Sequence, residues 1–92
     1  MLLFATARSQ YAIDAARGLF LQLPGGTPCG LRQGVWHAVV WDRQPKAGEP
    51  FFCSVAPREG GAPIALRTGP VTWVGPEPPV EALAEILAAR AT

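Results

Sequence analysis

Charged residues are scarce in this 92-residue sequence. Only 16% of the residues are charged, whereas 49% are hydrophobic and the mean hydropathy is +0.17. An average soluble domain carries roughly 25% charged residues. A chain so short of solubilising charge has either a generous core or a surface that a partner covers in part. We therefore expect an apolar docking face, occupied by a protein partner or by a second copy of the chain.

Long apolar runs are missing as well. No stretch approaches the roughly 18–20 consecutive apolar residues that cross a bilayer as a helix. The segment Leu2–Ala5 is apolar, but no basic residues precede it and it is shorter than the core of a signal peptide, about 7–15 residues. We interpret this segment as the first β-strand. The sequence predicts a cytoplasmic protein that does not bind a membrane.

Residue types that carry chemistry are few. The only histidine, His37, lies in the most apolar segment, where we expect a structural role. Cys29 and Cys53 could form one disulfide, but without a signal peptide free thiols are favoured. One histidine and two cysteines without C-x-x-C spacing do not make a zinc site, and the phosphate-binding and nucleophile-elbow glycine motifs are absent. We predict no catalytic residues, no metal, no cofactor and no enzymatic activity.

The distribution of charge disfavours nucleic acid as the partner. Residues 1–74 hold seven basic and four acidic residues (+3), residues 75–92 hold one and three (−2), and the sum is the net charge of +1. Firm non-specific binding to nucleic acid neutralises something like 6–10 phosphates. A nucleic-acid-binding β-barrel is therefore the alternative to a protein-binding domain, and a structural subunit whose sheet edge pairs with a neighbour is the third hypothesis.

The pattern of apolar residues predicts a mainly β domain. Short segments rich in β-branched and aromatic residues alternate with turns rich in glycine and proline. We expect a single domain over residues 1–92, with a β body over 1–74 that forms a small curled antiparallel sheet or partly open barrel of about 5–6 strands. The predicted strands cover residues 2–7, 35–41, 51–56 and 64–74, with two more if residues 9–23 form a hairpin.

Residues 9–23 fit two structures. A helix would gather seven apolar residues on one stripe, but it would carry Gly18 in its interior at a cost of about 1 kcal/mol. A hairpin would turn at residues 14–18, where Gly18 can adopt a positive φ, and would leave only Phe20 out of phase with its neighbours. The hairpin is favoured, and the helix remains open.

Two features are expected towards the C-terminus. Ile64 and Leu66 lie in one phase of the last strand and Val71 and Trp73 in the other, so a β-bulge or bend at Gly69-Pro70 would keep both pairs facing the core. A proline-rich linker over 75–79 then precedes an amphipathic α-helix over 80–91. The apolar stripe of this helix is Val80, Leu83, Ala84, Leu87 and Ala91.

The tryptophans and nearby cations indicate where a partner binds. Trp36 and Trp41 fall on opposite faces of the predicted strand 35–41, and three tryptophans can scarcely all be buried in so short a chain. An exposed tryptophan beside basic residues can anchor a partner. We predict a small non-catalytic binding or regulatory domain, such as an inhibitor, adaptor or subunit, whose binding residues are Trp41, Arg43, Lys46 and Arg58.

Overall fold

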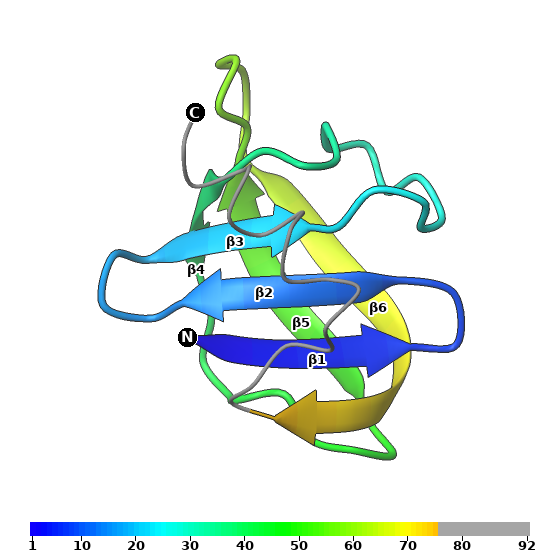
Figure 1. The fold of residues 1–92 in the computed structure, drawn as a ribbon. Helices are drawn as coiled ribbons and strands as arrows, with labels where there is room; N and C mark the ends of the chain where they lie inside the picture. Colours follow the sequence, from blue (N-terminus) through cyan, green and yellow to red (C-terminus); the bar gives the residue numbers. More distant parts are fainter. Residues whose placement is uncertain (76–92) are drawn as a thin grey trace.

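Six antiparallel strands, each paired with the next along the chain, surround a single interior (Figure 1). The structure is a computed structural model and describes residues 1–75. β6 pairs with β1, so the sheet closes into a barrel. The strands are β1 (Leu2–Thr6), β2 (Gln10–Asp14), β3 (Leu19–Gln22), β4 (His37–Val40), β5 (Pro50–Ala56) and β6 (Ile64–Gly75).

The predicted antiparallel β body is confirmed, but the barrel is closed rather than partly open. Closure follows from the length of β6, whose 12 residues pair with β5 through their first part and with β1 through their second. The described residues contain no helix, and so none that is long and apolar enough to cross a membrane. The predicted helix over 80–91 and most of the linker over 75–79 lie outside the described residues.

Residues 9–23 form the favoured hairpin. β2 and β3 pair from Tyr11↔Gln22 to Asp14↔Leu19. Gly18 closes the turn with a φ of +65°, a conformation that strains any residue with a Cβ. Phe20, which the sequence pattern leaves out of phase, shares the barrel interior with Tyr11, whereas Leu19 lies with residues of the outer side.

β6 is irregular at two places, of which the sequence predicted one. Pro50 pairs with Pro70 and Phe52 with Arg67, so β6 carries an extra residue next to Gly69. This confirms the predicted bulge, after which Val71 is buried as expected. The prediction that Trp73 faces the core is wrong, because its side chain is 40% exposed. A second register shift, where β6 pairs with Ala5 and Thr6, reverses the alternation between Val71 and Trp73.

Aromatic rings fill the barrel interior. Phe4 stacks on Tyr11 with ring centroids 4.9 Å apart, Phe51 lies 4.9 Å from Phe4, and Phe20 lies 5.5 Å from Tyr11. Aliphatic side chains complete this interior cluster, which consists of Phe4, Tyr11, Ile13, Phe20, Leu31, Val39, Phe51, Cys53, Val55, Leu66 and Val71.

A second apolar cluster lies on the outer side of β1, β2 and β3. Leu3 pairs with Ala12 and Ala12 with Leu21, so the three residues form a row across these strands, and Leu23 and Trp36 extend it. β1, β2 and β3 are therefore buried on both faces. β4 and β5 instead alternate strictly between buried and exposed residues. The barrel thus has one covered side and one open side.

Candidate functional site

The open side of the barrel carries a continuous exposed surface. Side chains of β4, β5 and β6 that point away from the interior lie next to one another in the strand register, for example Val40 beside Ser54 and Ser54 beside Ala65. Every one of them is exposed. We call this surface the β4–β6 face. Its residues are Ala38, Val40, Phe52, Ser54, Ala56, Ala65 and Arg67.

Two large apolar side chains dominate the β4–β6 face. Val40 is 72% exposed and Phe52 is 59% exposed. The neighbouring alanines and serine are small, so these two side chains stand above a low and nearly flat surface. Neither side chain contributes to the core of the barrel, because both point away from its interior. Exposed apolar side chains grouped on one face are typical of surfaces that bind other proteins.

The electrostatics of the β4–β6 face are simple. Arg67 is its one charged residue, and no carboxylate belongs to the face. The guanidinium of Arg67 lies 5.5 Å from the centroid of the Phe52 ring, in the cation–π arrangement. This contact fixes a positive charge beside the most prominent aromatic ring of the face. The face is therefore apolar, with a single positive charge.

The structure separates the four binding residues predicted from the sequence. Trp41 is half-buried and packs against the interior cluster. Arg43 and Lys46 are exposed in the loop between β4 and β5. Arg58 is exposed in the turn between β5 and β6, at the opposite end of β5. The loop residues Arg43 and Lys46 therefore lie at one end of the β4–β6 face and Arg58 at the other.

Val40 and Phe52, the most exposed large residues of the open face, were missed by the sequence reasoning. The sequence does indicate that Phe52 points outward, because Phe51, Cys53 and Val55 alternate with it along the strand and point into the interior. Val40 is harder to find, since its strand reads as apolar on both faces. Only the structure shows that the outer face of β4 lacks the cover that β1, β2 and β3 have.

His37 has a structural role, as expected. Its imidazole is almost fully buried, and its Nδ1 accepts a hydrogen bond of 2.8 Å from the backbone N–H of Arg58. The other nitrogen, Nε2, lies 3.0 Å from the carbonyl oxygen of Arg32 and therefore donates to it. The ring joins the loop before β4 to the turn after β5. With both nitrogens engaged, it has no lone pair left to act as a base.

A buried polar network occupies the end of the barrel next to the β1–β2 turn. The amide nitrogen of Gln22 donates to the carbonyl oxygen of Thr27 at 2.8 Å and to Ser9 Oγ at 3.3 Å. Cys29 Sγ donates to the amide oxygen of Gln22 at 3.1 Å. The backbone passes so close here that a Cβ on Gly26 would meet Ser9 Oγ at 2.6 Å. These hydrogen bonds hold the loop after β3 against the barrel.

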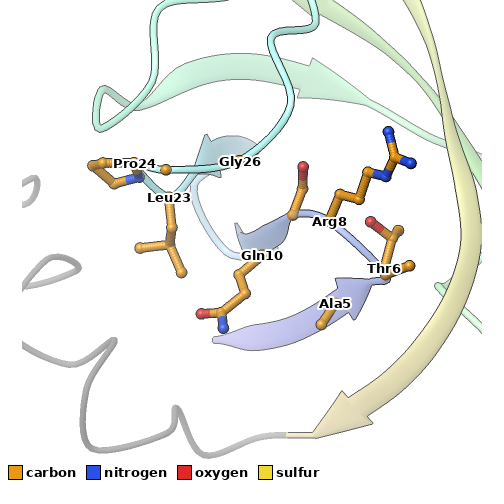
Figure 2. A pocket seen from close by; sticks show the side chains of 10 residues that line it. Ala5, Thr6, Arg8, Gln10, Leu23, Pro24 and Gly26 are labelled. Atoms are coloured by element: carbon orange, nitrogen blue, oxygen red, sulfur yellow. The ribbon is translucent and has the colours of Figure 1, made fainter.

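A shallow cleft of about 400 Å³ opens beside this network (Figure 2). The β1–β2 turn lines one side of the cleft and residues 23–26 line the other. Figure 2 shows Arg8 extending away from Leu23 and Gln10, so its guanidinium does not point into the space between the two walls. Arg8 is the one ionisable side chain among the residues that line this cleft.

The two thiols do not pair with His37, because both of its ring nitrogens bond to backbone groups. Cys29 and Cys53 are free in the structure. Burial raises the pKa of the Cys53 thiol to about 12, and the neighbouring Cys29 adds to the rise. A thiol with so high a pKa is not a nucleophile at neutral pH, because the thiolate is the reactive form. Residues 1–75 also contain no group of three or more side chains able to hold a metal ion.

The pKa of Cys53 predicts how stability depends on alkaline pH. The thiol of the unfolded chain ionises at about pH 8.5, so above that pH the unfolded state binds fewer protons than the native state. The free energy of unfolding should therefore fall as pH rises from about 9 to 12. Burial raises the pKa of Tyr11 too, which adds to the fall above about pH 10. Urea unfolding between pH 7 and pH 11 measures this slope.

The variant Cys53→Ala isolates the contribution of the thiol. Its stability at pH 7 is lower because a buried side chain is truncated, but its decline towards pH 11 should be shallower than that of the natural chain. Cys29→Ala is the control, and its curve should keep most of the steeper decline, because burial is the larger cause of the raised pKa of Cys53. Parallel curves for the natural chain and Cys53→Ala would contradict the assignment.

Comparison with protein-family models, with curated proteins and with solved structures finds no match to this chain.

Proposed function

We propose that the protein is a non-catalytic binding domain that docks a partner protein on the β4–β6 face. The observation that carries this proposal is the pair of exposed apolar side chains, Val40 and Phe52, on the side of the barrel that nothing in the described chain covers. Burying one such side chain contributes about 1.5–3 kcal/mol. Burial of both by a partner would therefore contribute about 3–6 kcal/mol before the costs of association.

The closure of the barrel restricts how a partner protein can bind. A sheet with a free edge strand can add a strand from a partner, but the pairing of β6 with β1 leaves no described strand free along its whole length. Side-chain contact is therefore the mode of binding on the β4–β6 face. This favours an inhibitor, adaptor or regulatory subunit over a structural subunit that assembles through strand pairing.

The partner is expected to be a different protein rather than a second copy. In a symmetric dimer the same face meets itself, so the interface would hold two copies of Arg67 and no carboxylate of the face to pair with either. Burying charges without a partner costs free energy. A partner surface with an apolar patch and one Asp or Glu opposite Arg67 avoids this cost.

Photo-crosslinking followed by affinity measurement tests the proposal. A benzophenone amino acid at position 52 should form an adduct with one partner protein in the native host, while the same group at Ala16, exposed in the β2–β3 turn, should not. With the identified partner purified, Val40→Asp should weaken binding by about 30-fold or more, because it places a charge in the apolar interface. Arg17→Asp, outside the face, should bind like the natural chain.

Three results would overturn the proposal. The partner could bind Val40→Asp as tightly as the natural chain, although thermal unfolding shows that both are folded. The adduct could be a dimer of this chain, which would make the face a self-association surface. The adduct could instead contain nucleic acid, with binding that weakens steeply as salt rises. The exposed Phe52 ring beside Arg67 is the one observation that favours this alternative.

A further inference from the structure

The first half of β6 has a neighbouring strand on one side only. β5 pairs with β6 between Ile64 and Pro70, but β1 pairs with β6 only from Val71 onwards. The cause is a difference in length, because β6 has 12 residues and β1 has five. The barrel therefore closes along the second half of β6, and no described strand pairs with the other side of the first half. We call the stretch from Ile64 to Pro70 the β6 edge.

Hydrogen bonds across the sheet show which backbone groups point out of the β6 edge. In an antiparallel sheet, the N–H and carbonyl of one residue point to one neighbouring strand and those of the next residue point to the other. The N–H of Val39 donates to the carbonyl of Gly18, before β3, so Val40 faces β5. Val40 is the register partner of Ser54, which therefore faces β4. Ser54 is in turn the register partner of Ala65, so Ala65 faces away from β5.

The backbone groups of Ala65 and Arg67 are therefore unpaired at the β6 edge. Arg67 lies two residues after Ala65 on the strand and points the same way. Neither residue has a backbone hydrogen bond on this side within residues 1–75, and both are exposed. The N–H of Phe51 donates to Thr68 Oγ1, which agrees with the alternation because it places that N–H on the β6 side of β5. Unpaired donors and acceptors in this arrangement are a template for a further strand.

A cleft of about 540 Å³ lies along the β6 edge. Residues 65–70 form one wall of the cleft, and the β1–β2 turn with residues 27–29 forms the other. One residue of a strand occupies about 3.4 Å along the strand, 4.8 Å across the sheet and 10 Å through it, or roughly 160 Å³. The cleft therefore has room for about three residues, which is also the span from Ala65 to Arg67. A short extended segment would lie where β1 would continue if it were longer.

The lining of this cleft is positively charged. Arg8 and Arg67 belong to the lining, which contains no Asp or Glu. Figure 2 shows Arg8 extending from the β1–β2 turn towards β6. The one ion pair within residues 1–75 is that of Arg17 with Asp14, so Arg8 has no carboxylate partner among the described residues. A cleft lined by charge of one sign attracts groups of the opposite sign.

We propose that the β6 edge binds an extended, acidic segment of a partner protein by strand addition. The backbone of the segment pairs with Ala65 and Arg67, and its carboxylates lie near the two arginines of the cleft. The bulge at Gly69-Pro70 ends the regular edge and limits the pairing to about three residues. This site goes beyond the proposed function, because the β4–β6 face binds through side chains and uses no free edge.

Peptide selection followed by a backbone variant tests the proposal. A phage library of random short peptides, selected on the full chain, should yield peptides rich in Asp and Glu. Ala65→Pro removes the N–H that points into the cleft but no hydrogen bond of the barrel, and edge positions of this kind tolerate proline. It should weaken binding of the selected peptides by about tenfold or more. Ala65→Val, the matched control that keeps the N–H, should bind them like the natural chain.

Two further measurements locate the bound peptide and test its charge. In backbone amide NMR, the selected peptides should shift the resonances of Ala65 and Arg67 and slow the hydrogen exchange of both amides several-fold. Arg8→Gln should weaken binding by about threefold, the usual size of an effect from an exposed ion pair.

The proposal is overturned if the selected peptides bind Ala65→Pro as tightly as the natural chain, or if the selection yields no acidic peptides. Should Ala65→Pro not fold, methylation of the peptide's backbone nitrogens replaces it, and unchanged affinity of the methylated peptide has the same meaning. Slow exchange that appears without peptide and increases with protein concentration would mean that a second copy occupies the edge. The β4–β6 face is tested separately: Val40→Asp should bind the selected peptides normally, and Ala65→Pro should leave the crosslink at position 52 unchanged.

Discussion

Replacing His37 with alanine is expected to lower the free energy of unfolding by about 3–5 kcal/mol. Two effects add up. The buried ring is removed, which leaves a cavity, and the N–H of Arg58 and the carbonyl of Arg32 lose their partner. Both hydrogen bonds are partly buried, so each backbone group left unsatisfied costs at most about 1–3 kcal/mol. Domains of this size are stable by about 5–15 kcal/mol, so this loss is a large share of the total. At about 4–8 °C per kcal/mol, the melting temperature should fall by roughly 12–40 °C.

Urea unfolding followed by tryptophan fluorescence measures this loss. His37→Gln is the informative companion, because its amide has a donor nitrogen and an acceptor oxygen and can satisfy at least one of the two groups. Its loss should be clearly smaller than that of His37→Ala. A loss below about 1 kcal/mol for the alanine variant would show that the ring does not join the two loops as the 2.8 Å and 3.0 Å contacts indicate.

The parts of the fold that the sequence predicts are those set by local pattern. The strand around His37, the turn at Gly18 and the bulge near Gly69 each carry their own signal: β-branched residues, a glycine that tolerates positive φ, and a change of phase. The side of the sheet to which Trp73 points was not predictable from local pattern. It depends on how β6 pairs with β1, about 70 residues earlier in the chain, and one extra residue in that pairing reverses the side chain.

The candidate site was only half predictable, for the same reason. Low charge and high apolar content predicted an apolar docking face, and the β4–β6 face is the exposed apolar surface that we propose for it. Its location was not predictable, because β1–β3 and β4–β6 both present apolar residues outward in the sequence. Leu21 and Val40 look equivalent in a pattern of alternating residues, yet one is 0% exposed and the other 72%. What distinguishes them is which side of the closed barrel is covered, a property of the whole fold.

The pairing of β3 with β4, which we call the seam, is the shortest strand pairing in the barrel. A substitution at this seam is the second change that we expect to lower stability strongly. Only two residue pairs join these strands, Leu19↔Ala38 and Phe20↔His37, whereas the other neighbouring strands are joined by three to five pairs. Phe20 is 0% exposed and its ring lies 5.5 Å from that of Tyr11. Its side chain therefore anchors the seam to the aromatic interior.

Phe20→Ala is accordingly expected to cost about 3–5 kcal/mol, the usual range for a buried phenylalanine. Phe52→Ala is the matched control: its ring is 59% exposed and faces away from the interior, so its loss should stay below about 1 kcal/mol. Because Phe20 and His37 face each other across the seam, their losses should not be additive. A double-mutant cycle with Phe20→Leu and His37→Gln should give a coupling free energy of about 0.5 kcal/mol or more. Additive losses would mean that the two residues stabilise the barrel independently and that the seam is not a cooperative unit.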